Sequence, residues 1–307
     1  MLRPYRSMLF LPGHRPTWVE KAIRAGADAI CLDLEDAVPA AEKEAARAVV
    51  AESVGRAKRL KPGVGVLVRV NGLPTGMTGF DLEAVMVPGV DGIFAPKIED
   101  AADALRFDTL VEWFERRNGV SGVGLAIPME TAKAFSNVEA IAASTPRIGI
   151  ILGSTAEHAD VAREIGFEWT PQGLETLAHR ARVLLACRVA GVHAMTGLWE
   201  RIHDLDGLRA FCDQGRQIGF RGQIAIHPSH VDVINQAFGP SAEDIAFYRG
   251  LVEAYRAAAD AGSGAAVYRG RHIDKAHVDK ATEWLARAEQ VTEFDAAPTA
   301  EGEGQHA

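Results

Sequence analysis

The sequence predicts an α/β fold, a (β/α)8 barrel followed by a helical C-terminal extension. Short runs of apolar and β-branched residues alternate eight times with amphipathic segments, in which apolar residues recur at i, i+3, i+4 and i+7. The eight runs are predicted strands, at residues 7–11, 29–34, 65–70, 92–95, 123–127, 148–152, 192–195 and 223–226. Eight strands that alternate with helices over about 230 residues fit a closed parallel barrel better than an open doubly wound sheet.

The segments between the predicted strands carry the signals of helices. Predicted helices lie at residues 16–25, 43–59, 101–117, 132–143, 173–190 and 205–218. Glycine often stands just before the next strand, as at Gly26, Gly122, Gly191 and Gly219, which is the expected helix C-terminal signal. No GxGxxG follows a strand and no GxxxxGK[ST] occurs, which argues against a nucleotide-binding fold.

The alternation of strands and helices stops after residue 228, by which point all eight predicted strands of the barrel have been counted. The predicted elements beyond it are two helices, a glycine-rich hairpin and a last helix, at residues 231–238, 242–261, 262–271 and 275–291. We therefore divide the chain into a barrel, a C-terminal helical extension and a disordered tail, at residues 1–235, 236–291 and 292–307. We expect the extension to pack on the barrel mouth or on a neighbouring subunit. The tail is acidic and poor in apolar bulk, which is typical of disorder.

Composition narrows the class of function. The 307 residues carry a net charge of −8, which argues against nucleic-acid binding, because that requires a basic surface to displace counterions. The three cysteines, Cys31, Cys187 and Cys212, form no CxxC pair and no zinc spacing, so we expect thiols in a reducing compartment. No signal peptide and no run of about 18 apolar residues is evident. We expect a cytoplasmic protein with no membrane partner.

Two acidic side chains end the second predicted strand, and catalytic groups lie at strand carboxyl ends in barrels of this kind. Alternation along residues 29–34 places Asp33 and Glu35 on one face, opposite Leu32 and Leu34. Acids aimed into a barrel mouth often hold the water shell of a metal ion or a cationic partner. The alternative is a solvated strand end.

Two basic side chains end the next strands. Arg69 is flanked by valines, and an arginine that faces inward is costly to bury without an anion. Its planar guanidinium suits a carboxylate or an oxyanion, with an internal ion pair to Asp33 or Glu35 as the alternative. Lys97 could form a Schiff base, but nothing in the sequence indicates a depressed pKa. We favour a structural or electrostatic role for it.

Acidic side chains also follow the fifth and sixth predicted strands. Glu130 can reach the barrel axis, where Mg²⁺ binds one or two protein carboxylates and several waters; a helix N-terminal position is the alternative. Glu157 or Asp160 can supply a second carboxylate. His158 is a weak metal candidate, because no second histidine or cysteine keeps ligand spacing with it, and we expect it on a surface helix. We expect His227 to be a hydrogen-bonded residue of the barrel rim.

Taken together, these segments resemble the citrate lyase β-subunit-like (CitE-like) group of the HpcH/HpaI aldolase superfamily, which includes malyl-CoA, β-methylmalyl-CoA and citramalyl-CoA lyases and some thioesterases. The motifs that carry the resemblance are, in chain order, RSMLFLPG at 6–13, LDLEDAVP at 32–39 with Lys43 and Arg47, VRVN at 68–71, PK at 96–97, ET at 130–131 and IHP at 226–228. The resemblance runs from about residue 3 to about residue 290. It implies a Mg²⁺-binding TIM barrel that forms trimers or hexamers. It further implies that Arg69 contacts substrate oxygens and that Glu130 binds the metal ion beside the substrate.

The second metal ligand of that group is an aspartate just after the sixth strand, and here the spacing of the chain departs from the group. Counting forward from Glu130 places Ala156 at the ligand position, whereas counting back from residues 166–171 places Asp160 there. The chain therefore carries about four extra residues, the length of one helical turn. The resemblance favours Asp160 as the second ligand, with Glu157 as the substitute.

The resemblance implies a carbon–carbon lyase that cleaves or forms a β-hydroxyacyl-CoA, such as malyl-CoA or citramalyl-CoA, to an acyl-CoA and a 2-oxo acid. Arg69 would stabilise the oxyanion, and Glu35 is a further catalytic candidate. Asp274, from the extension of a neighbouring subunit in a homotrimer, would be the acid or base at the enolate carbon; its alternative is a helix N-cap. Two other interpretations stay open: an acyl-CoA thioesterase, and a citrate lyase β-like subunit that acts on a carrier-bound thioester or without catalysis.

Overall fold

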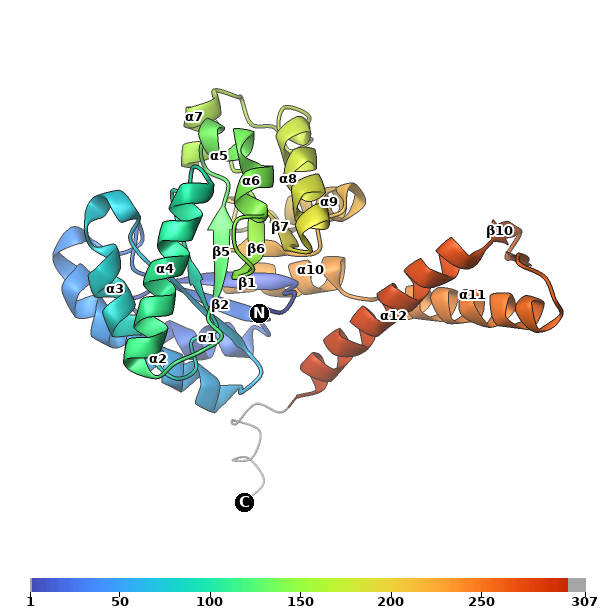
Figure 1. Cartoon of the computed structure of the whole chain (residues 1–307), viewed down its shortest axis with the longest axis horizontal. Coiled ribbons are helices and arrows are strands. Elements are labelled where there is room, and N and C mark those ends of the chain that lie inside the picture. The colour runs from blue at the N-terminus through green and yellow to red at the C-terminus, as the bar shows by residue number, and fades with distance from the viewer. Residues whose placement is uncertain (1, 298–307) are drawn as a thin grey trace, which may run out of the picture. The chain divides into compact units, whose positions relative to one another are not determined.

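The computed structural model describes residues 2–297 and contains the closed parallel barrel that the sequence predicts (Figure 1). The strands pair in chain order, and the ring closes between β8 and β1. They are β1 (Ser7–Pro12), β2 (Ala29–Asp33), β3 (Gly65–Arg69), β4 (Gly92–Phe94), β5 (Gly124–Pro128), β6 (Ile148–Gly153), β7 (His193–Thr196) and β8 (Gln223–Ala225). Each end lies within one residue of its predicted position. The predicted TIM-barrel fold is therefore confirmed.

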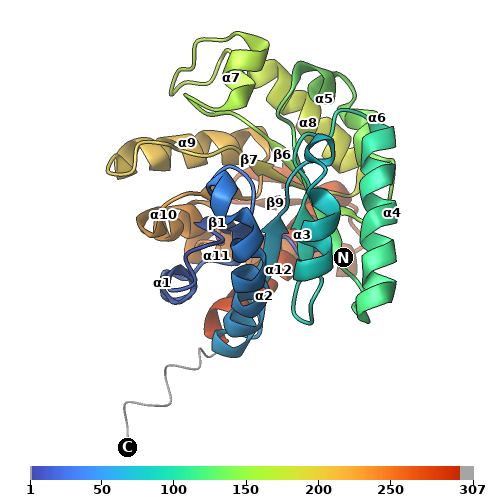
Figure 2. The same cartoon turned by 90° about the vertical axis from the view of Figure 1, so that its left-hand side faces the viewer.

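Helices surround the strands, as Figure 2 shows. They are α1 (Trp18–Arg24), α2 (Lys43–Leu60), α3 (Thr78–Val85), α4 (Ala101–Asn118), α5 (Ala132–Ser136), α6 (Val138–Ala142), α7 (Asp160–Ile165), α8 (Leu177–Ala190), α9 (Leu205–Ile218) and α10 (Pro228–Phe238), with two short 3₁₀ turns, η1 (Ala40–Glu42) and η2 (Leu73–Thr75). The helix predicted over 132–143 is two helices, because the backbone of Asn137 leaves the helical region at φ −113° and ψ 10°. The helix predicted from residue 173 begins at Leu177, because Gly173 has a left-handed φ of 61°. The short helix α3 was not predicted.

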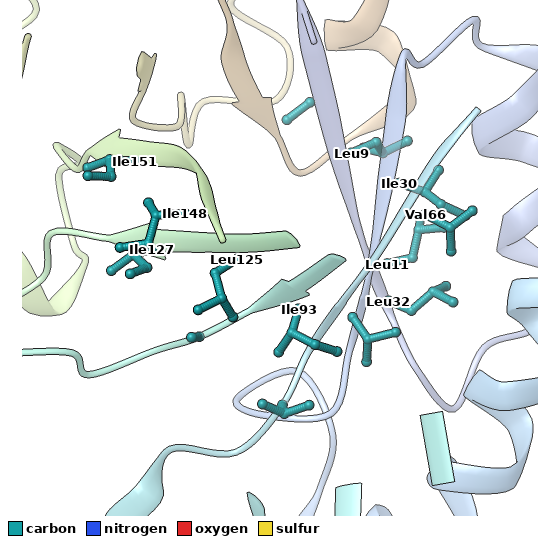
Figure 3. Close-up of a cluster of buried hydrophobic side chains, with 14 of the residues drawn as sticks. Leu9, Leu11, Ile30, Leu32, Val66, Ile93, Leu125, Ile127, Ile148 and Ile151 are labelled. Carbon is teal, nitrogen blue, oxygen red and sulfur yellow. The ribbon is translucent and has the colours of Figure 1, made fainter. Parts of the chain in front are cut away.

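Side chains of the strands alternate between two hydrophobic clusters. Outward-facing residues such as Leu9, Ile30 and Val66 pack in the main core between strands and helices (Figure 3). The residues that alternate with them face the barrel interior and form the second cluster, which contains Tyr5, Met8, Ala29, Cys31, Leu67, Phe94, Ala126, Ile150, Leu152, Met195 and Ile224. This alternation directs the last residues of β2 and β3 to the barrel mouth. The three cysteines are free and buried.

The chain divides into two compact units, with the break between Phe238 and Gly239. The second unit contains α11 (Ala242–Asp260), a hairpin of β9 (Ala266–Tyr268) and β10 (Arg271–Ile273), and α12 (Lys275–Ala296). Its own small core joins α11, the hairpin and α12 through Leu251, Val252, Ile273 and Ala281.

The predicted disordered tail begins too early. Helix α12 continues to Ala296, and Phe294, an apolar residue to which the prediction gave no weight, is buried. The remainder of the predicted tail, residues 298–307, lies outside the described residues. Within residues 2–297, no helix combines the length and apolar character needed to cross a membrane.

Candidate active site

A cavity of about 560 Å³ opens where the carboxyl ends of the strands meet. Its apolar lining comes from strand residues, from the loops that follow them and from the start of α1, and includes Phe10, Phe94, Leu152, Ile224, Leu198, Ile226 and Trp18. Its charged lining includes Asp33, Asp36, Arg69, Glu130 and Asp160. A mostly apolar hollow with a few convergent charges is the usual form of a small-molecule site.

Asp33 fixes the orientation of Arg69 in this cavity. The parallel register pairs the two residues directly, and Asp33 accepts hydrogen bonds from Arg69 Nε at 2.8 Å and Nη2 at 2.6 Å. The same carboxylate accepts the backbone N–H groups of Glu35 and Ala37. Burial lowers the pKa of Arg69, but the bonds to Asp33 and its charge raise it above the ordinary value. The guanidinium therefore stays charged and is held from one side.

Glu35 lies beside the remaining nitrogen of the guanidinium. Arg69 Nη1 is 3.0 Å from Glu35 Oε2 and 3.6 Å from Asp36 Oδ2. The Glu35 oxygen is buried, and its contact with Arg69 is not aligned as a hydrogen bond. Burial raises the pKa of Glu35 to about 7, with Arg69 opposing the shift and the charges of Asp36, Glu130 and Asp33 adding to it. Glu35 can therefore exchange a proton near neutral pH.

The arrangement around Arg69 is the internal ion pair that the sequence left open as an alternative. It joins Arg69 to both acids, Asp33 and Glu35, and the guanidinium also lines the cavity. Its planar face lies over the ring of Phe10, with 5.5 Å from the guanidinium carbon to the ring centre. Nε and Nη2 are hydrogen-bonded to Asp33, whereas Nη1 has only longer contacts with Glu35 and Asp36. Nη1 is therefore the nitrogen best placed to bind a ligand in the cavity.

Lys97 brings together the two acids that follow β5 and β6. Its Nζ lies 2.8 Å from Glu130 Oε2 and 2.6 Å from Asp160 Oδ2. Burial raises the pKa of Glu130, whereas the hydrogen bond from Lys97 lowers that of Asp160. The other Asp160 oxygen is 2.9 Å from Arg163. Two carboxylates from separate segments thus converge on one point beside the cavity.

Glu157, the other acid considered after β6, is directed elsewhere. It forms an ion pair with Arg201, whose Nη2 lies 3.1 Å from both carboxylate oxygens. The guanidinium of Arg201 stacks over the rings of Trp169 and Trp199, with 5.5 and 5.7 Å to the ring centres. Asp160, and not Glu157, therefore lies with Glu130.

The extra residues after β6 form a loop instead of a helical turn. Helix α7 begins only at Asp160, because Ala159 has an extended backbone with φ −77° and ψ 162°. His158, predicted on a surface helix, therefore lies in this loop and lines the cavity, and its backbone N–H donates to the Glu200 carboxylate. His227 follows β8, and its Nδ1 is 2.7 Å from Ser229 Oγ.

Asp274 belongs to the second unit and caps α12. Its side chain accepts the N–H of His277, and the His277 side chain accepts the N–H of Asp274, which completes a capping box. The hydrogen bonds from His277 lower the pKa of Asp274. These local contacts match the N-cap that the sequence left open as the alternative to catalysis.

The acidic side chains at the cavity are of the kind that binds Mg²⁺. Among residues 2–297, no group of three or more His, Cys, Asp or Glu side chains is placed to hold a metal ion by itself. Mg²⁺ needs only one or two protein carboxylates and completes its shell with waters and substrate oxygens, whereas zinc sites take three or four His, Cys or acidic ligands. Glu130 and Asp160 supply such a carboxylate pair.

The sequence did not show that Lys97 joins these carboxylates or that Arg201 holds Glu157. Each contact links segments more than 30 residues apart along the chain, so no local motif could carry it. The lysine was recognisable by its place after a strand and by the PK motif at 96–97, but its partners were not.

The family model described as HpcH/HpaI aldolase/citrate lyase matches residues 6–228. The chain belongs to this family. Among its relatives, a (3S)-malyl-CoA thioesterase of Cereibacter sphaeroides is 36% identical, over 95% of this chain and 98% of the relative. An L-malyl-CoA/β-methylmalyl-CoA lyase of the same species is 33% identical, over 94% and 96%. The citrate lyase β subunit of Escherichia coli K12 is 32% identical, over 94% of both chains.

Solved structures of similar proteins agree with the HpcH/HpaI assignment. CitE of Mycobacterium tuberculosis, in complex with magnesium, acetoacetate and coenzyme A, is 27% identical with a TM-score of 0.71, over 93% of this chain and 98% of that one. A citrate lyase of Burkholderia xenovorans has a TM-score of 0.80 at 19% identity over 97% and 96%, which supports the fold alone. The resemblance seen in the sequence motifs is confirmed, and the HpcH/HpaI relatives are named as lyases and thioesterases.

Proposed function

We propose that this protein is a Mg²⁺-dependent carbon–carbon lyase acting on a β-hydroxyacyl-CoA such as malyl-CoA or citramalyl-CoA. The reaction cleaves this thioester reversibly to an acyl-CoA and a 2-oxo acid. The observation that carries the proposal is the convergence of Glu130 and Asp160 beside a cavity that also contains Arg69. The lyase relative at 33% identity supports the reaction class.

Glu130 and Asp160 would hold the metal ion, and Arg69 would bind the substrate oxygen that gains charge. Bound Mg²⁺ would supply Lewis-acid stabilisation of the carboxylate and carbonyl oxygens of the 2-oxo acid. Arg69 is held by Asp33 before substrate arrives, so little reorganisation is needed when the oxyanion forms. Its Nη1 would leave Glu35 and Asp36 for that oxygen.

Glu35 and Asp274 are the proposed proton-transfer groups. Glu35 has a pKa of about 7 and lies 3.0 Å from Arg69, so it can hold or release a proton beside the oxyanion site. Asp274 is proposed to come from the C-terminal extension of a neighbouring subunit in a homotrimer or hexamer. As a carboxylate that is ionised at neutral pH, Asp274 would act as the base that generates the enolate in the condensation direction. We expect this oligomer in the cytoplasm.

Turnover of malyl-CoA and citramalyl-CoA by purified protein with Mg²⁺ tests the proposal. We expect Glu130→Gln and Asp160→Asn each to lower kcat/KM at least 100-fold, because each removes one of two metal ligands. Glu157→Gln is the matched control, since it removes a nearby carboxylate held by Arg201, and it should change kcat/KM less than threefold. Full turnover in both Glu130→Ala and Asp274→Ala would refute the mechanism.

The second candidate function is hydrolysis of a malyl-CoA-like thioester, which the 36% identity to a (3S)-malyl-CoA thioesterase favours. The products separate the two reactions. A lyase leaves the thioester intact and produces a 2-oxo acid, detected with phenylhydrazine, whereas a thioesterase releases the free CoA thiol. If no acyl-CoA is turned over, the chain is better explained as a citrate lyase β-like subunit that binds a carrier-bound thioester.

A further inference from the structure

Lys97 has a backbone conformation that residues other than glycine rarely adopt. Its φ is 55°, and within residues 2–297 the other non-glycine residue with a positive φ is Arg269. Such left-handed backbone is strained for a residue with a long side chain and persists only where the surroundings require it. Strain of this kind often marks functional positions, so the contacts of this side chain are informative.

The ammonium of Lys97 is the counter-charge of the carboxylate pair. It lies between Glu130 and Asp160, 2.8 and 2.6 Å from one oxygen of each. Within residues 2–297, Lys97 is the cation in ion-pair contact with Glu130, whose side chain is mostly buried. A buried carboxylate without a counter-charge is strongly destabilising. Lys97 therefore keeps the two acidic segments together when no other cation is bound.

We propose that the Lys97 ammonium competes with the metal ion for the carboxylates of Glu130 and Asp160. This competition sets the affinity of the site for divalent cations. This inference rests on the metal site of the proposed function. An ion coordinated by Glu130 and Asp160 either displaces the ammonium from their oxygens or lies beside a positive charge. Both alternatives weaken metal binding, so loss of the ammonium strengthens it.

Binding of Mn²⁺ to the full-length protein without substrate, followed by electron paramagnetic resonance, tests the proposal. Lys97→Met keeps an aliphatic side chain and removes the charge, and we expect it to bind Mn²⁺ about tenfold more tightly than the natural protein. Charge-assisted hydrogen bonds to two carboxylates would support a larger change, but the ammonium is about one-third exposed and partly screened. Lys97→Gln, which can still donate to both acids, is the second variant in case Lys97→Met does not fold.

Lys133→Met is the matched control. Lys133 also bridges two acids, with Nζ 3.3 Å from Glu99 and 3.0 Å from Asp100, and its loss changes the net charge equally. We expect its Mn²⁺ affinity to stay within twofold of the natural protein. A second readout is thermal: Lys97→Met should melt below the natural protein without metal and gain more from saturating Mn²⁺.

The outcomes separate this inference from the proposed function. If the natural protein binds Mn²⁺ and both Lys97 variants bind it equally or more weakly, the competition is refuted while the metal-dependent lyase stands. If neither the natural protein nor the folded variants bind Mn²⁺, the metal site itself is refuted. Tighter binding in Lys133→Met as well would also refute the inference, because the effect would then come from net charge alone.

Discussion

Replacing Asp33 with asparagine tests how much the bonds between this carboxylate and Arg69 contribute to the stability of the fold. Asp33 is 1% exposed and accepts two hydrogen bonds from Arg69 and two from backbone N–H groups. An asparagine amide retains one acceptor oxygen, but its NH₂ group faces donors, so one guanidinium bond and one backbone bond are lost. Breaking a buried pair costs about 3–5 kcal/mol, and we expect about 2–3 kcal/mol here because Arg69 keeps Glu35 and some solvent.

Thermal unfolding followed by circular dichroism measures this loss. For a barrel of this size, about 2–3 kcal/mol corresponds to a decrease in Tm of roughly 4–6 °C. Asp36→Asn is the matched control: it removes a carboxylate from the same guanidinium, but that carboxylate is 77% exposed and 3.6 Å away. We expect less than about 0.5 kcal/mol from it. Equal Tm values for Asp33→Asn and Asp36→Asn would refute the structural role of Asp33.

Two further predictions concern pH and packing. The pKa of Glu35 is about 7 in the folded protein and near 4.5 in the unfolded chain. The stability that the protonated carboxyl group contributes is therefore complete below pH 4.5 and is lost as the pH rises through 7. This loss amounts to about 3 kcal/mol. Glu35→Gln should therefore flatten the fall in Tm between pH 5 and 8, and an unchanged profile would contradict the burial argument. Gly65→Ala should destabilise by about 1–3 kcal/mol in urea unfolding, because its Cβ would meet the Tyr5 ring. Gly79→Ala, which meets nothing within 4 Å in helix α3, should be neutral or stabilising, and equal losses in both would contradict this.

The eight strands were predictable because each is a short apolar run that is buried on both faces. Such a run is a local signal, and the glycines that precede several strands are local signals as well. Predictions were less accurate where a single residue determines where a helix begins, divides or ends. Asn137 divides the helix predicted over 132–143, Ala159 delays the start of α7, and Phe294 extends α12. These effects depend on packing partners that periodicity does not contain.

The sequence by itself determined the barrel, the family and the residues that end its strands. Alternation directs Asp33 and Arg69 inward at the carboxyl ends of their strands, and the parallel order brings Glu130, which follows the fifth strand, to the same mouth. Which of these charges meet could not be read from the chain, since a side chain's partner depends on segments far apart in sequence.

The tertiary structure decided those partners. It places Asp160 with Glu130 and turns Glu157 to Arg201, and it inserts the ammonium of Lys97 between the two acids. The raised pKa of Glu35 likewise comes from burial, which exists only once the barrel and its loops enclose the carboxyl group.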